Sequence, residues 1–159
     1  MTADVFEAVR RGVFGTAQPL PSHIDLRQTN ESGQTLLHVA IASKQIDVAQ
    51  QLVARGIEIN AIDDQGQTAL HYCAAYHLPT IAQCILQQGG QLSIADRHGN
   101  TPLWAAVFNA RGDYRLVQVL LEYGGGKFAE VKNRHGRSPL DFARQIGDTA
   151  LAELLVNHA

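Results

Sequence analysis

The chain has 159 residues, of which 45% are hydrophobic, 18% charged and 6% aromatic, and its formal net charge is −2. This length is sufficient for one domain with a buried core, and the ordinary apolar content argues against intrinsic disorder. The near-neutral charge argues against a strongly basic nucleic-acid binder, and two cysteines are too few for a disulfide framework. The sequence contains no apolar run long enough to cross a bilayer and no N-terminal signal peptide. We therefore expect a cytoplasmic protein with no membrane partner.

The first predicted element is an amphipathic helix that includes Val5, Phe6 and Val9. Segment 16–21 follows it and contains two prolines, which would interrupt the interior of a helix. We therefore expect any helix in that segment to be shortened or missing.

A segment of eight residues then occurs four times, beginning at Gly33, Gly66, Gly99 and Gly136. The successive copies are separated by 33, 33 and 37 residues. Two residues after each glycine stands a Thr or Ser, whose hydroxyl is suited to cap a helix N-terminus, namely Thr35, Thr68, Thr101 and Ser138. In the last two copies a proline follows, at the first helical position, where its missing N–H costs nothing. Each copy therefore predicts the start of a short helix.

A second helix is predicted after the first one in each unit, as in segment 46–55, where apolar residues recur at helical spacing. These second helices are followed by glycines suited to the left-handed conformation that ends a helix, namely Gly56, Gly89 and Gly124. An extended stretch and a polar turn, such as 57–60 and 63–66, then lead into the next unit.

These four copies resemble the ankyrin repeat, whose Thr-Pro-Leu-His-x-Ala core recurs with a period of 33 residues. The resemblance covers essentially the whole chain and implies an all-α solenoid of stacked helix–turn–helix units with hairpin-like connecting loops. We expect a single domain, residues 1–159, in which residues 1–29 form an N-terminal cap. Repeats are expected at 30–62, 63–95 and 96–132, and a C-terminal cap at 133–159.

The third repeat departs most from the family pattern. Four extra residues lie in segments 109–114 and 124–128, and we interpret the glycines at 124–126 as a helix cap that leads into a longer loop. Trp104 replaces the histidine of the motif, and we expect this to remove a hydrogen-bond partner. Insertions in repeat proteins often mark a binding site, although a neutral insertion is the alternative.

The histidines and cysteines have structural interpretations. His38 and His71 belong to the repeat motif, where a histidine can share the hydrogen bonds of the capping threonine. His98 and His135 occupy matching turns, which the spacing of about 10 Å between packed helices would keep too far apart to share an ion. The two cysteines lie on the apolar faces of their predicted helices, so we expect small buried thiols. We expect no catalytic site, metal or cofactor, and hence no enzyme.

The resemblance implies a protein-binding concave surface, formed by the hairpin tips and the exposed sides of the first helices. Carried over to this chain, it selects the following residues: Glu31, Ser32, Gln34, Ala42, Ser43, Asp64, Gln65, Gln67, Ala75, Tyr76, Arg97, His98, Asn100, Phe108, Asn109, Arg134, His135 and Arg137. The insertion in the third repeat adds Arg111 and Tyr114. The turns change sign along the stack, from Glu31, Asp63 and Asp64 to three arginines. Segment 97–137 holds seven basic residues against three acidic ones, a local charge of +4, which could orient a partner. We place the main contact at Phe108, Arg111, Tyr114 and the Arg97–His98 turn.

The leading hypothesis is a monomeric protein that binds one partner protein through this surface and acts as an inhibitor or an adaptor. One version, suggested by the resemblance to small ankyrin proteins, is a cognate immunity-type inhibitor of a bacterial toxin or enzyme. The third hypothesis is a nucleic-acid-binding accessory protein, against which stand the net charge of −2 and the lack of a nucleic-acid motif.

Overall fold

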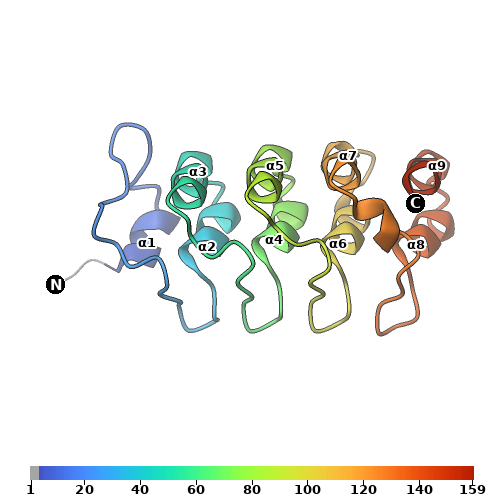
Figure 1. The fold of residues 1–159 in the computed structure, drawn as a ribbon, viewed down its shortest axis with the longest axis horizontal. Coiled ribbons are helices and arrows are strands. Elements are labelled where there is room, and N and C mark those ends of the chain that lie inside the picture. Colours follow the sequence, from blue (N-terminus) through green and yellow to red (C-terminus); the bar gives the residue numbers. More distant parts are fainter. Residues whose placement is uncertain (1–3) are drawn as a thin grey trace.

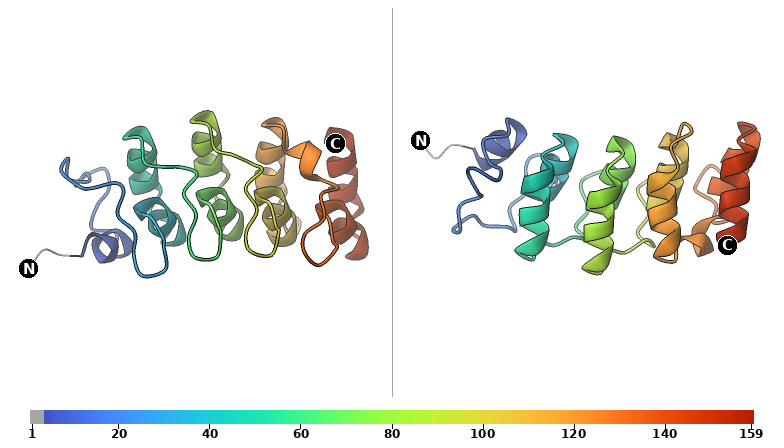
Figure 2. Two further views of the ribbon diagram at one scale, coloured as in Figure 1. Left: turned by 60° about the horizontal axis from the view of Figure 1, so that its bottom comes forward. Right: turned by 90° about the horizontal axis from the view of Figure 1, so that it is seen from above.

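The computed structural model describes residues 4–159 as a row of helix pairs in two layers (Figures 1 and 2). The inner layer, next to the long loops, consists of α1 (Val5–Arg10), α2 (Leu36–Ala42), α4 (Ala69–Tyr76), α6 (Pro102–Asn109) and α8 (Pro139–Gln145). The outer layer consists of α3 (Ile46–Ala54), α5 (Pro79–Gln87), α7 (Arg115–Glu122) and α9 (Thr149–His158). The described residues contain no strand, only an isolated bridge between Thr29 and Thr35. The all-α solenoid is confirmed.

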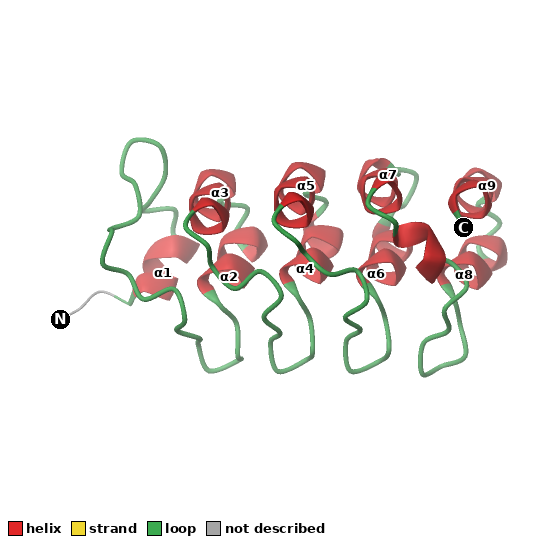
Figure 3. Ribbon diagram, viewed as in Figure 1, coloured by secondary structure: helices red, strands yellow, loops and turns green. Residues whose placement is uncertain are grey.

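Hairpin-like loops precede α2, α4, α6 and α8 and project from one edge of the row (Figure 3). The predicted caps of these four helices are confirmed. For example, the hydroxyl of Thr35 accepts a hydrogen bond from the backbone N–H of His38, and that of Ser138 accepts one from Asp141. Pro102 and Pro139 are the first residues of their helices. Caps and prolines therefore set where each inner helix begins.

The ends of the outer helices are also as predicted. Gly56, Gly89 and Gly124 follow α3, α5 and α7 with φ angles of 77°, 91° and 85°, in the left-handed region that glycine adopts without strain. The core lies between the two layers and between successive pairs. It is built from fully buried aliphatic side chains such as Leu70, Ile85 and Leu120, each of which stabilises the fold by about 1.5–3 kcal/mol.

The N-terminal unit has only one helix, because no helix lies between α1 and α2. The expectation that segment 16–21 lacks a regular helix is therefore confirmed. Side chains of α3 hold this segment instead: Gln51 accepts a hydrogen bond from the N–H of Leu20 at 3.0 Å, and Arg55 donates to the carbonyl of Pro21 at 3.0 Å. No helix within residues 4–159 is long and apolar enough to cross a membrane.

The third unit contains a short 3₁₀ helix that the sequence did not reveal, η1 (Gly125–Phe128). The glycines at 124–126 do not form an open loop, because Gly125 and Gly126 are buried. A Cβ atom at Gly126 would overlap the carbonyl oxygen of His158, at the end of α9. The second insertion of this repeat therefore fills the space beside the last helix rather than extending into solvent.

Candidate partner-binding surface

Each hairpin tip is held in shape by one short polar side chain. These side chains belong to Asn30, Asp63, Asp96 and Asn133. The Oδ1 atom of each accepts hydrogen bonds from the backbone N–H groups two and four residues later, at 2.8–3.1 Å. Asp63 is therefore buried and does not belong to the exposed acidic part of the strip, contrary to the sequence hypothesis. Asp64 beside it is exposed, as is Gln65.

Backbone hydrogen bonds join each hairpin tip to the next one. The N–H of Asp64 donates to the carbonyl of Ser32 at 3.1 Å, that of Arg97 to Gln65 at 2.9 Å, and that of Arg134 to His98 at 2.9 Å. These bonds fix the tips in a ladder, so that side chains at equivalent positions of adjacent repeats lie next to one another.

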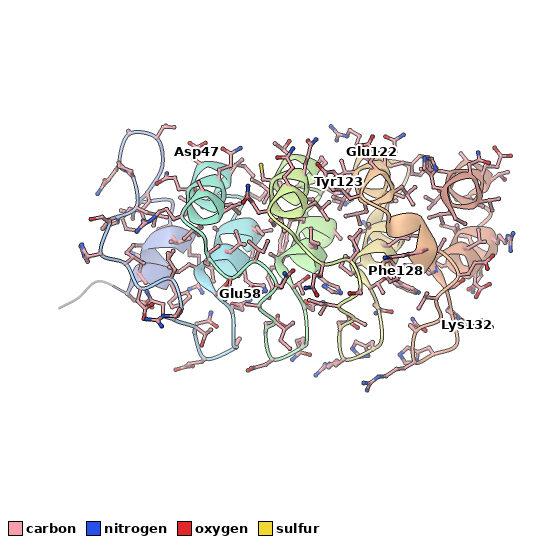
Figure 4. All side chains as sticks on the ribbon, in the orientation of Figure 1. Asp47, Glu58, Glu122, Tyr123, Phe128 and Lys132 are labelled. Carbon is pink, nitrogen blue, oxygen red and sulfur yellow. The ribbon has the colours of Figure 1, made fainter. Side chains whose placement is uncertain are left out.

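Three arginines gather on the third and fourth tips, where nitrogen-ended side chains project from the row (Figure 4). Arg97, Arg134 and Arg137 are all exposed, and none forms an ion pair with the described residues. Their charges are therefore available to a partner. We call these three residues the arginine tips.

His98 and His135 stand closer together than the sequence analysis predicted. Their ring centroids are 6.0 Å apart and the rings are stacked at 28°, because the side chains lean toward each other across the ladder. The spacing of the repeat backbones was a poor guide to the distance between the rings. Arg97 Nε also donates to Nε2 of His98, at 3.4 Å. Among residues 4–159 no three His, Cys, Asp or Glu side chains are placed to hold a metal ion.

An aromatic cluster lies where the fourth hairpin meets the inner helices. Trp104 and Phe108 of α6 are stacked with ring centroids 5.4 Å apart, and Phe142 of α8 lies 5.6 Å from Trp104 and 5.3 Å from Phe108. The rings meet because residues four apart share one face of α6. Together with Asn133, His135 and Arg137 they line a hollow of about 340 Å³. Phe108 remains 51% exposed.

Trp104 does not make the side-chain hydrogen bond to the capping threonine that the motif histidines make, as expected, but it does make a bond to the next repeat. Its Nε1–H donates to the backbone carbonyl of Arg137 at 3.1 Å. The ring Nε2 atoms of His38 and His71 make the equivalent bonds to the carbonyls of Gln67 and Asn100, at 3.0 and 2.9 Å. The indole N–H therefore replaces the imidazole in the bond to the next repeat, but not in the bond to the capping threonine.

His38 and His71 are structural, as the repeat motif predicted. In both, Nδ1 accepts a hydrogen bond from the backbone N–H of the capping threonine, while Nε2 faces a carbonyl oxygen and must donate to it. Each imidazole is therefore neutral, and burial lowers its pKa. Cys73 is buried too, and burial raises the pKa of its thiol, so that the reactive thiolate is disfavoured.

Several predicted contact residues on the hairpin side take part in the scaffold. The carboxamide of Asn100 accepts a hydrogen bond from that of Asn133 at 2.8 Å. Gln67 is half-buried, and its carbonyl faces His38. Tyr76 is exposed, and its ring lies 6.3 Å from that of Tyr72 on the inner helix α4.

The predicted main contact separates into two groups. Phe108 joins the hairpin side because its ring stacks back on Trp104, whereas Asn109, Arg111 and Tyr114 lie at the opposite end of α6, where the chain turns into α7. There the hydroxyl of Tyr114 donates to Asp148 at 2.6 Å, which ties this turn to the start of α9. Arg111 is exposed.

Trp104 and Phe142 were not predicted from the sequence as surface residues. The spacing of Trp104 and Phe108 on one helix was the available signal, but the contribution of Phe142 depends on how the next repeat stacks. Two other aromatic residues of the third repeat lie away from the tips: Tyr123 follows α7 in the outer layer, and Phe128 is the last residue of η1 (Figure 4).

Comparison with known protein families agrees with this architecture. A family model for ankyrin repeats in three copies matches residues 5–96 and again residues 60–130. No curated protein matches the chain significantly. Ankyrin repeats are generally protein–protein interaction modules and are typically non-enzymatic. With most of its length matched by the family model, the chain belongs to the ankyrin-repeat family.

Proposed function

We propose that this protein acts in the cytoplasm by binding one partner protein, as an inhibitor or an adaptor, and that it is not an enzyme. The contact surface comprises the hairpin tips and the exposed sides of the inner helices; we call it the inner surface. The observation that carries the proposal is the half-exposed Phe108, which lines one hollow with Arg137, an arginine without an ion pair among the described residues. Aromatic residues and arginine are the types that dominate the energetics of protein interfaces.

We divide the inner surface into two parts. Asp64, Gln65, Gln67 and Tyr76 form its N-terminal part, which is acidic at the tips. The arginine tips, the two stacked histidines, Asn100 and the aromatic cluster form the C-terminal part. We propose Arg111 and Tyr114, with Asn109, as a separate patch at the far end of α6. The repeat bounds 30–62, 63–95 and 96–132, flanked by caps, are part of the same proposal.

Site-specific photocrosslinking in the native cell tests this function. A photoreactive benzoylphenylalanine at position 108 would stand on the inner surface, and one at position 47, which is exposed on α3 (Figure 4), serves as the matched control on the outer layer. We expect a covalent adduct with one protein from position 108 and none from position 47. Equal adducts from both positions, or none from position 108, would contradict the proposal.

The role of the complex is tested once the partner is captured. An immunity-type inhibitor would form a tight stoichiometric complex that abolishes the activity of a toxin or enzyme, whereas an adaptor would leave that activity intact. If position 108 crosslinks to RNA or DNA instead, the function is nucleic-acid binding, and affinity should then fall steeply with salt.

A further inference from the structure

We infer that the hollow at the aromatic cluster receives an apolar side chain from an acidic segment of the partner protein. This inference rests on the proposed function, and it specifies the chemistry of the segment that is bound. It combines three observations: the lining of the hollow, the unpaired charge on its rim, and the opposite charge farther along the tips.

The aromatic side of the hollow favours an apolar occupant. Three of the six lining residues are aromatic, and the one polar group on their rings, the indole N–H of Trp104, already donates to the carbonyl of Arg137. A polar side chain placed against these rings would lose its hydrogen bonds to water without replacing them. An aliphatic or aromatic side chain would instead cover the exposed half of Phe108.

The rim of the hollow is positively charged and lacks an internal counter-charge. Arg137 lines the hollow, and Arg97 and Arg134 stand on the two hairpin tips that adjoin it. The nearby carboxylates have other roles: Asp96 is buried and holds its turn, and Asp141 accepts the N–H of Ser138. An acidic residue of a partner would therefore meet arginines with no intramolecular competitor, and a charge-assisted hydrogen bond would form.

The charge changes sign along the ladder of tips, because Glu31 and Asp64 are exposed on the first and second tips. A uniformly acidic ligand would be repelled there, whereas a protein segment can carry its acidic residues at one end only. The rings also argue against nucleic acid, since they stack on one another rather than standing apart as a platform for successive bases. The inferred ligand is therefore a protein segment with a local acidic cluster.

The chain contains a single tryptophan, so its fluorescence reports directly on the hollow. We would select binders from a phage-displayed library of random dodecapeptides on the immobilised full-length protein, then titrate the enriched peptides while following Trp104 emission. We expect enriched peptides to carry an aromatic residue or leucine flanked by Asp or Glu, and to shift Trp104 emission saturably. Enrichment of basic peptides, the absence of enrichment, or binding without a change in Trp104 emission would overturn the inference.

Variants at exposed positions test the same contacts with little risk to folding. Phe108→Ala and Arg137→Glu should each weaken the selected peptide by about tenfold or more. The matched controls, Tyr123→Ala and Arg144→Glu, change an exposed aromatic residue and an exposed arginine away from the hollow, and should alter affinity by less than about twofold. Equal effects of the variants and their controls would contradict the inference. Phe108→Ala removes the apolar contact, and Arg137→Glu reverses the charge beside it. The two halves of the site are therefore tested independently.

The two hypotheses fail in different ways. If position 108 crosslinks to one protein but the library yields basic or purely apolar peptides, the proposed function stands and the acidic-segment inference is wrong. If acidic peptides bind at Trp104 but no protein is crosslinked from position 108 in the cell, the chemistry of the hollow stands and the proposed function is wrong. A single-stranded oligonucleotide that shifts Trp104 emission more strongly than the peptides would refute both.

Discussion

At the scale of single residues, one ring in each of the inner helices α2, α4 and α6 ties that helix to the following repeat. His38, His71 and Trp104 each direct a ring nitrogen at a backbone carbonyl in the next hairpin. In the two histidines the other ring nitrogen is also occupied, by the N–H of the capping threonine. These imidazoles are held neutral because a second proton would displace that bond, and their burial has a consequence for the pH dependence of stability.

We predict that the free energy of unfolding falls as the pH drops below about 6.5, the ordinary pKa of histidine. Burial lowers the pKa of His38 and His71 in the folded chain, so between 6.5 and the lowered values only the unfolded chain takes up these protons. The loss can reach about 1.4 kcal/mol per pH unit for each histidine. Urea denaturation between pH 7.5 and 5.5 measures it.

The control for this prediction is the double variant His38→Gln, His71→Gln. It should be less stable at pH 7.5, because two buried networks are perturbed, but its stability should change less between pH 7.5 and 5.5. If the double variant retains the full pH dependence of the natural chain, other groups are responsible for it and the argument from burial fails.

At the scale of elements, the hairpins depend on one acceptor each. The carboxylate of Asp96 holds the third tip through the N–H groups of His98 and Asn100, at 2.8 and 2.9 Å. In the fourth hairpin, the neutral amide of Asn133 accepts the equivalent hydrogen bonds through its Oδ1 atom. The turn therefore requires the acceptor oxygen rather than the negative charge, and this distinction can be tested.

We predict that Asp96→Ala lowers the free energy of unfolding by about 1–3 kcal/mol, because two N–H groups lose their acceptor. Asp96→Asn should lower it by less than about 1 kcal/mol, since the amide oxygen retains both bonds. Chemical denaturation of both variants provides the measurement. If the two substitutions are equally destabilising, the charge of Asp96 matters more than its geometry.

The second element whose packing has a testable consequence is η1, which contacts both α7 and α9. We predict that Gly126→Ala lowers the free energy of unfolding by about 1–3 kcal/mol and exposes the last turn of α9 to hydrogen exchange, because the new methyl group overlaps the carbonyl of His158. The matched control is Gly124→Ala, where φ is 85° but no atom lies within 4 Å of the new Cβ.

Gly124→Ala should lower stability through backbone strain alone, by about 1–2 kcal/mol, and should leave exchange in α9 unchanged. Hydrogen exchange resolved by segment separates the two effects. Increased exchange of α9 in both variants, or in neither, would show that η1 does not support the last helix.

The features that the sequence predicted are those determined within one repeat. The cap at Thr35, the proline that begins α6 and the left-handed Gly56 follow from a few neighbouring residues, and all three are as predicted. The features that it missed depend on the next repeat. The stacking of His98 on His135 and the reach of Trp104 to Arg137 join hairpins that only the stacked structure brings together.

The candidate site shows the same division. The exposure of Phe108 and of the arginine tips could be predicted, because the place of a residue within the repeat motif indicates whether it faces solvent. The aromatic cluster could not, since Phe142 belongs to the following repeat and reaches Phe108 only through stacking. Asp63 was wrongly expected to be exposed; it is buried and accepts the hydrogen bonds that shape its turn.

At the scale of the whole molecule, the chain is a one-dimensional stack in which each helix contacts its own pair and the adjacent ones. Helix α4 packs on α2, α5 and α6, whereas α9 packs on α8 and η1. The central repeats are therefore supported from two sides and the C-terminal unit from one. In such arrays stability is approximately the sum of the contributions of the units and of their interfaces with neighbours.

We predict that a cavity at one end affects the chain differently from a cavity at its centre. Leu151 in α9 and Leu70 in α4 are both at most 1% exposed. Leu→Ala therefore removes the same buried atoms at each position and lowers local stability by about 2–5 kcal/mol. Leu151→Ala should increase hydrogen exchange in α8, α9 and η1 while α2 to α5 stay protected. Leu70→Ala should increase exchange on both sides of α4, because two interfaces lose support. If both variants raise exchange uniformly along the chain, the repeats unfold as one cooperative unit and the division into repeats and caps has no energetic counterpart.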